Sequence, residues 1–102
     1  MFETLTDSNF EEKILKSDKL AVVDLSAEWC GPCRMVGPVV EEIANETTTA
    51  KVGKVNVDEQ PELAAAFKVM SIPTLIVMKD GKVVNTIVGA RPKADIVKML
   101  NI

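Results

Sequence analysis

The sequence predicts one α/β domain over residues 1–102, in which helices cover both faces of a mixed β-sheet. Segments with helical spacing alternate with short apolar runs typical of strands, and the last two runs are joined by a tight turn. The five glycines and five prolines are dispersed between these segments, so no linker divides the chain. A length of 102 residues is enough for one domain with its own core.

The first expected elements are a helix and a buried strand. Ser8 and Glu11 have the spacing of a capping box, which marks the start of a helix. Three apolar residues then share one helical face: Phe10, Ile14 and Leu15. The run Leu20–Leu25 is typical of a buried strand. Its one charged residue, Asp24, is out of place there and becomes a candidate functional residue.

A second helix is expected after Cys30. Its apolar residues recur at the spacing of one helical face: Val36, Val40, Ile43 and Ala44. Pro38 falls inside this pattern. Because proline removes one backbone donor, we expect it to kink the helix rather than to end it.

Two further strands and a short helix follow. Val52–Val57 is typical of a strand that leads to Asp58. Pro61 suits the first turn of a short helix over residues 62–68. The apolar run Thr74–Met78 is the next expected strand.

The chain is expected to end with a hairpin and a helix. Asp80-Gly81 is typical of a two-residue hairpin turn, so Val83–Val88 returns as the partner strand. Gly89 ends that strand, and Pro92 opens the last helix. This helix has three apolar residues: Ile96, Val97 and Leu100.

The composition excludes several classes of enzyme. The chain has no histidine, which rules out a Cys–His protease, a Ser–His–Asp hydrolase and a His-ligated metal site. A structural zinc site needs about four ligands, usually Cys or His, and the two cysteines do not supply them. We therefore expect no metal within one chain.

The charge and the lengths of the apolar runs indicate where the protein is expected to be located and which partners are not expected. Twelve basic residues stand against fifteen acidic ones, and no three basic residues are consecutive, which argues against a nucleic-acid partner. Residues 1–7 lack the pattern of a secretory signal, and the apolar runs are far shorter than a membrane span. We expect a cytoplasmic protein without a membrane partner.

Both cysteines lie in Trp29-Cys30-Gly31-Pro32-Cys33, directly after a predicted strand and at the start of a helix, which makes the pair a redox signal. At a helix N-terminus, free N–H groups and the positive dipole end favour the Cys30 thiolate. Cys33 follows one turn later, so the two sulfurs reach each other. Gly31 keeps the approach to Cys30 open, and Pro32 suits a first turn.

A structural disulfide and a pair of metal ligands are the two alternatives for these cysteines. Closing a four-residue loop constrains the unfolded chain by about 2 kcal/mol, against about 4.7 kcal/mol for a loop of about 100 residues. A disulfide across so short a loop adds little to the stability of the fold, and it is easily switched between its oxidised and reduced forms. Metal binding lacks the other ligands, so redox catalysis is the favoured interpretation.

Asp24 is the second candidate for chemistry. A carboxylate buried in an apolar strand has a raised pKa, and Asp24 precedes Cys30 by only six residues. In a chain without histidine, Asp24 is the natural acceptor for the proton that Cys33 loses during disulfide exchange, through water. Lys54, on the neighbouring apolar segment, is a candidate partner. The alternatives are an Asp that faces solvent at the end of its strand and a Lys on an exposed strand face.

Two other positions belong to the expected site. Ile72-Pro73 precedes an apolar strand, and a cis bond there would expose backbone groups beside the cysteines. The residues alone favour an ordinary trans bond, since cis is a small minority of X-Pro bonds. Trp29, directly before a helix start, is expected to cap the site and to contact partners, although a core position is the alternative.

The chain resembles the thioredoxin family over nearly its whole length. The complete Trp-Cys-Gly-Pro-Cys motif with a downstream Ile-Pro-Thr is highly specific. The residues that carry the resemblance are Asp24, Ala27–Met35, Pro38, Lys54, Val57-Asp58, Ile72-Pro73-Thr74, Asp80-Gly81 and Val88-Gly89-Ala90.

The resemblance implies the thioredoxin fold, a central mixed five-stranded sheet flanked by four helices, and the reduction of protein disulfides. Cys30 matches the nucleophile and Cys33 the resolving thiol. Asp24 matches the family's buried carboxylate, Lys54 its neighbour, and Pro73 the family's cis-proline. The resemblance further implies recycling by a thioredoxin reductase, no bound cofactor and a monomer that serves as a general intracellular electron donor to disulfide-containing proteins.

The family also docks its targets on an apolar patch around the cysteines. In this chain the corresponding residues are Trp29, Gly31, Pro32, Ile72, Pro73, Gly89 and Ala90.

Residues 25 and 26 depart from the family pattern. Leu25 and Ser26 stand where the family usually has an aromatic pair, with a tryptophan commonly at the Ser26 position. The change introduces a hydroxyl near the active-site helix and removes aromatic packing. We expect it to affect the redox potential, the stability and the preference for a reductase, and not the type of reaction.

Two alternative functions fit the same motif. One is a thiol oxidase or isomerase of the same fold, which differs by a more oxidising potential. The Gly31-Pro32 pair resembles the reductase version. The other is a non-enzymatic subunit of a larger assembly, against which the intact cysteine motif argues.

Overall fold

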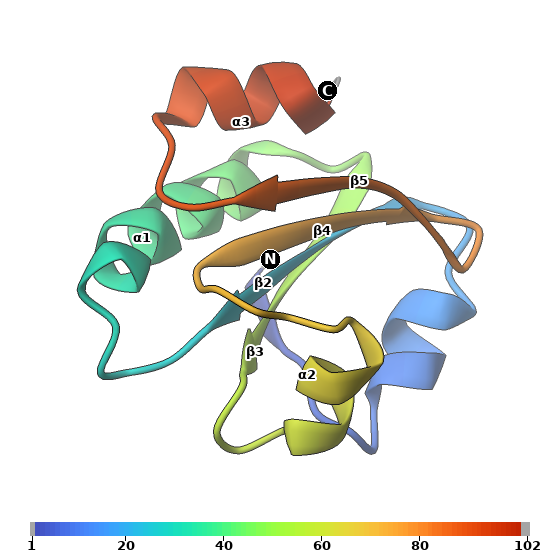
Figure 1. The fold of residues 1–102 in the computed structure, drawn as a ribbon. Coiled ribbons are helices and arrows are strands. Elements are labelled where there is room, and N and C mark those ends of the chain that lie inside the picture. Colours follow the sequence, from blue (N-terminus) through green and yellow to red (C-terminus); the bar gives the residue numbers. More distant parts are fainter. Residues whose placement is uncertain (1, 101–102) are drawn as a thin grey trace.

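A computed structural model describes residues 2–100 of the protein. Its centre is a five-stranded sheet in the order β1-β3-β2-β4-β5 (Figure 1). The first three strands in this order are parallel, and β4 and β5 are each antiparallel to the preceding one. The strands are β1 (Phe2–Thr4), β2 (Leu20–Ser26), β3 (Ala50–Asn56), β4 (Thr74–Lys79) and β5 (Lys82–Val88). The predicted mixed sheet is confirmed.

Helices cover both faces of this sheet (Figure 1). Helices α1 (Gly31–Glu46) and α3 (Lys93–Leu100) lie on one face. Helix α2 (Pro61–Ala66) and a short π-helical segment, η1 (Glu11–Leu15), lie on the other. The three layers agree with the predicted architecture. No helix among residues 2–100 is long and apolar enough to cross a membrane.

The two faces hold separate apolar cores, because successive strand residues point to opposite sides. In β2, Val22 packs into the core beneath α1 and α3, whereas Val23 and Leu25 pack into the core beneath α2 and η1. Asp24 follows Val22 by two residues and therefore faces α1. This alternation places a carboxyl group under the helix that the cysteines begin.

The turn before η1 differs from the prediction. η1 has no side-chain cap, so the predicted capping box at Ser8 and Glu11 is wrong. A reciprocal pair lies two residues earlier, where the Thr6 N–H donates to Asn9 Oδ1 at 2.8 Å and the Asn9 N–H donates to Thr6 Oγ1 at 3.2 Å. The Asn9 side-chain oxygen supplies the acceptor that the prediction assigned to Glu11.

Strand β1 was not indicated by the residue pattern, because three residues are too few to show a period. It pairs with β3 at the sheet edge, with Phe2 opposite Val52 and Thr4 opposite Lys54. The chain then passes closely over β3. A Cβ atom added at Gly53 would lie 2.5 Å from Leu5 Cδ1, so any side chain at this crossing would have to displace the buried Leu5.

The other predicted elements agree with the structure within a few residues. α1 continues through Pro38, so the proline does not end the helix, and a kink there stays a prediction. α2 is shorter than predicted and ends at Ala66. The turn between β4 and β5 has φ of +53° at Asp80 and +77° at Gly81, which fits the predicted two-residue hairpin.

Candidate active site

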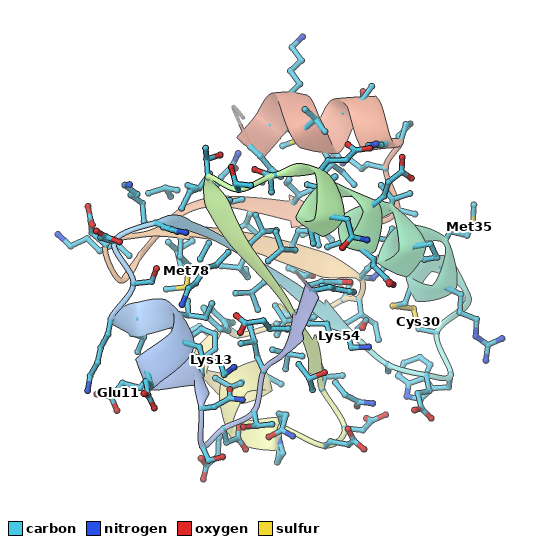
Figure 2. All side chains as sticks on the ribbon, turned by 180° about the vertical axis from the view of Figure 1, so that it is seen from behind. Glu11, Lys13, Cys30, Met35, Lys54 and Met78 are labelled. Carbon is cyan, nitrogen blue, oxygen red and sulfur yellow. A yellow bond between two sulfur atoms is a disulfide. The ribbon has the colours of Figure 1, made fainter. Side chains whose placement is uncertain are left out.

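The two cysteines lie where β2 ends and α1 begins. Cys30 is the N-cap of α1, and the Cys33 N–H donates to Cys30 Sγ at 3.2 Å. The two residues form a disulfide, with their Cα atoms 5.3 Å apart (Figure 2). Pro32 occupies the first turn, where its missing N–H costs no hydrogen bond. The Cys33 N–H and the helix dipole both favour negative charge on Cys30 Sγ when the disulfide opens.

Burial alone does not distinguish the two cysteines. Cys30 is 4% exposed and Cys33 is 5% exposed. Their surroundings differ, because Cys33 lines a cleft beneath α1, while Cys30 Sγ lies 3.9 Å from the Ile72 carbonyl oxygen. The segment before β4 thus lies directly beside the first cysteine.

The Ile72–Pro73 peptide bond is cis. The Gly89 N–H donates to the Pro73 carbonyl at 2.9 Å, which ties the segment after β5 to the same place. The cis bond agrees with what the resemblance implies and not with the ordinary bond that the residues alone favour.

The residues expected to dock targets differ in exposure. Pro73 is buried, whereas Ile72 and Gly89 are half-buried. The other four are exposed: Trp29, Gly31, Pro32 and Ala90.

Trp29 lies on the surface and not in the core. It is 69% exposed, and its Nε1–H donates to Asp58 Oδ2 at 2.8 Å. Asp58 follows β3 and is not among the site residues that the sequence predicts. The only signal in the sequence is an acidic residue shortly after a strand, which is too common to identify Asp58 before its contact with Trp29 is known.

Asp24 is buried beneath α1 and is 2% exposed. Burial raises the pKa of its carboxyl group to about 7, and the charge of Lys54 opposes this rise. Among residues 2–100, Asp24 Oδ1 has no hydrogen-bond partner. A carboxyl group with such a pKa exchanges protons readily near neutral pH.

Lys54 lies beside Asp24 in the sheet, because the two residues are partners in the parallel register of β2 and β3. In the part of the chain that the structure describes, no ion pair joins their side chains. The structure therefore brings the two predicted residues side by side in the sheet, with no ion pair between them among the described residues.

A cleft of about 450 Å³ lies between α1 and the edge of the sheet. It is lined by Asp24, Ser26, Cys33 and Lys54, among others. Gly37 of α1 also borders it, and a Cβ atom at this glycine would meet nothing within 4 Å. Ser26, where the family commonly has tryptophan, thus borders open space beside the second cysteine.

Comparison with known proteins agrees with this geometry. The thioredoxin family model matches residues 1–102. Thioredoxin 2 of Chlorobaculum tepidum is 52% identical over 97 residues, which cover 94% of this chain and 89% of the relative. The thioredoxin of Listeria monocytogenes is 50% identical over 102 residues, covering 99% and 97%. That of Mycobacterium tuberculosis is 51% identical over 98 residues, covering 95% and 84%. The chain therefore belongs to the thioredoxin family, and it is a thiol–disulfide oxidoreductase that acts on protein disulfides and is re-reduced by a thioredoxin reductase.

Proposed function

We propose that Cys30 is the nucleophile and Cys33 the resolving thiol in the reduction of protein disulfides. The observation that supports this most is the position of Cys30 as the N-cap of α1, with the Cys33 N–H directed at its sulfur. This donor and the helix dipole stabilise a thiolate at Cys30, and a thiolate is the species that attacks a disulfide.

The exchange has two steps. The Cys30 thiolate attacks one sulfur of the target disulfide, forms a mixed disulfide and releases the other target sulfur, which takes up a proton. Cys33 then loses its proton and attacks Cys30 Sγ, which releases the second target sulfur and closes the Cys30–Cys33 disulfide. Two electrons pass from the protein to its target, and the reductase returns two electrons to the disulfide.

Asp24 takes the proton that Cys33 loses in the second step. Both residues line the same cleft, and the pKa of Asp24 of about 7 makes its ionised form a usable base at neutral pH. Lys54 modulates this base by its charge. Water in the cleft carries the proton between the two side chains.

Targets bind on the surface around Cys30. The exposed ring of Trp29 and the exposed Gly31, Pro32 and Ala90 form this surface with Ile72, Pro73 and Gly89. The carbonyl of Ile72 lies beside the attacking sulfur, so an extended target segment reaches main-chain groups there.

The protein acts as a single-domain monomer in the cytoplasm, without nucleic-acid or membrane partners. Its net charge of −3 supports the absence of nucleic acid. The radius of gyration of 12.1 Å supports one domain, since about 13 Å is expected for a compact domain of about 100 residues.

Single-cysteine variants test the two assigned roles. Reduced Cys33→Ser is expected to accumulate a mixed disulfide with insulin through Cys30, because the second step is blocked. Cys30→Ser is expected to form little mixed disulfide and to reduce no insulin. Mass spectrometry of acid-quenched reactions checks both results. A mixed disulfide that forms mainly in Cys30→Ser would reverse the assignment.

The pH dependence tests Asp24. Asp24→Asn is expected to slow the second step, in which Cys33 is deprotonated, and to leave the first step near its native rate. Stopped-flow measurement of mixed-disulfide decay between about pH 6 and about pH 8 follows this step. An unchanged pH–rate profile would exclude the proton role.

A further inference from the structure

Lys54 lies between two groups that compete for its ammonium. β3 lies between β1 and β2 in the sheet, and Lys54 is the register partner of Thr4 on one side and of Asp24 on the other. Phe2 of β1 and Val22 of β2 both pack against the core beneath α1. Phe2 and Asp24 therefore flank Lys54 from opposite sides on the same face of the sheet.

The ammonium of Lys54 lies on the side of the aromatic ring. Its Nζ atom is 5.5 Å from the centroid of the Phe2 ring, within the range of a cation–π interaction. Figure 2 shows Lys54 beside β1 and away from Cys30. On the other side, Asp24 Oδ1 has no hydrogen-bond partner among residues 2–100, and no ion pair to Lys54 forms within that range.

The cleft beneath α1 gives the Lys54 side chain room to move between Phe2 and Asp24. Phe2, Asp24 and Lys54 all line it. The other charged residues on its wall come from the segment before α1, from α1 and from the segment after β3: Glu28, Arg34, Glu41 and Glu59. Arg34 is held by the Glu28 carbonyl, and Lys54 is the charge that acts on the pKa of Asp24.

We propose that Phe2 is a positioning residue for the redox reaction: its ring holds the Lys54 ammonium away from Asp24 and leaves that carboxyl group free to exchange a proton with Cys33. This inference rests on the proposed role of Asp24. When Asp24 ionises, the attraction between its buried carboxylate and the exposed ammonium of Lys54 competes with the weaker attraction of the ring. Lys54 therefore shifts toward Asp24 when Asp24 loses its proton and returns to Phe2 when it gains one.

Removal of the ring tests this arrangement. In oxidised Phe2→Leu, Lys54 is free to approach Asp24, and the pKa of Asp24 is expected to fall by about half a unit. Phe2→Tyr keeps an aromatic ring and is expected to keep the native pKa. The measurement is an NMR titration of the carboxyl carbon of Asp24, which reports on this group and needs no catalysis.

The Lys54→Met background separates the effect of the lysine from a general effect of packing. In that background, Phe2→Leu is expected to leave the pKa of Asp24 unchanged, because the group that the ring holds is absent. An unchanged pKa in the single variant overturns the proposal. An equal fall in both backgrounds also overturns it, since the ring would then act through packing alone.

The native protein supplies a second measurement if Phe2→Leu does not fold. The protons next to Nζ of Lys54 are expected to show an upfield ring-current shift at low pH, which decreases as Asp24 ionises. Absence of the shift, or a shift independent of pH, contradicts the proposal. The titration can succeed while Asp24→Asn leaves exchange rates unchanged, in which case the role of Asp24 fails and the placement of Lys54 by Phe2 stands.

Discussion

A buried carboxyl group with a raised pKa makes Asp24 the residue at which stability and function conflict. Asp24 is 2% exposed, its Oδ1 lacks a partner among the described residues, and burial raises its pKa from 3.8 to about 7. The ionised form is therefore disfavoured in the folded state. A chain selected for stability alone would have an uncharged residue at this position.

Replacing Asp24 is expected to stabilise the protein at high pH. Between pH 3.8 and about 7 the unfolded chain releases the Asp24 proton while the folded protein keeps it, so stability falls as pH rises through this window. Oxidised Asp24→Asn is expected to be more stable than the native protein by on the order of 4 kcal/mol at about pH 8, and equally stable at about pH 4. Urea unfolding across this range checks the difference. A constant difference at every pH would show that the cause is not ionisation.

The hydrogen bond between Trp29 and Asp58 is expected to affect target binding more than folding. Asp58→Ala frees the exposed indole, so we expect KM for a protein disulfide to rise about three-fold with little change in kcat. Asp58→Asn keeps an acceptor oxygen and serves as the matched control. Steady-state kinetics with a fixed reductase measure both, and a fall in kcat alone would contradict a docking role.

At the residue scale, sequence reasoning found the groups whose chemistry is unusual for their position. The two cysteines and a charged residue in an apolar strand were visible because each breaks a pattern. Asp58 and Phe2 could not be recognised in the same way, because neither breaks a pattern. Asp58 is an acidic residue after a strand and Phe2 an aromatic residue near the N-terminus, and both are ordinary until their partners are known. Those partners, Trp29 and Lys54, are distant in sequence and meet only in the fold.

At the scale of elements, the junction of β2 and α1 carries the redox site, and the edge formed by β1 and β3 supports it. Long elements were predicted well, because their apolar residues repeat often enough to show a period. The capping box before η1 was misplaced by two residues, since Asn9 provides the same acceptor as the expected glutamate. β1 has too few residues to show a period, and its place depends on pairing with β3.

Two glycines in different elements are expected to respond in opposite directions to the same substitution. Gly53→Ala places a methyl group 2.5 Å from Leu5 Cδ1 and 3.2 Å from the Glu3 carbonyl, and Leu5 is fully buried. We expect a loss of about 1–3 kcal/mol from this overpacking.

Gly37→Ala in α1 is the matched control, because its Cβ meets nothing within 4 Å apart from its chain neighbours and the backbone of its own helix. There the higher helix propensity of alanine is expected to add about 0.5–1 kcal/mol. Chemical unfolding of both variants measures the effects, and losses of equal size would contradict this account.

At the scale of the whole molecule, the sheet holds two cores and brings distant segments to one end. The start of α1, the cis bond before β4 and the segment after β5 meet beside Cys30. The spacing of residues in the sequence did not predict that these three segments lie together, because they are far apart in the chain. The family resemblance supplied it, and the structure shows the contacts that hold it.

The direction of electron flow is a property of the whole molecule. The Gly31-Pro32 pair between the cysteines resembles the reductase version, and the match to the thioredoxin family favours a reductase over an oxidase or isomerase. The disulfide is therefore expected to persist in glutathione buffers that reduce the disulfides of oxidising relatives. Thiol alkylation after equilibration measures the reduced fraction. Complete reduction at a mildly reducing glutathione ratio would favour the oxidase or isomerase.

The hairpin at Asp80-Gly81 has a practical consequence for engineering. β4 begins beside the cis bond and ends at this turn, so the turn lies about 20 Å along the strands from the disulfide, at about 3.3 Å a residue. Asp80 and Gly81 are exposed, and loop tips of this kind tolerate insertions. An affinity tag or fluorescent reporter grafted here would leave the redox face unobstructed, so the protein could be immobilised or tracked during turnover.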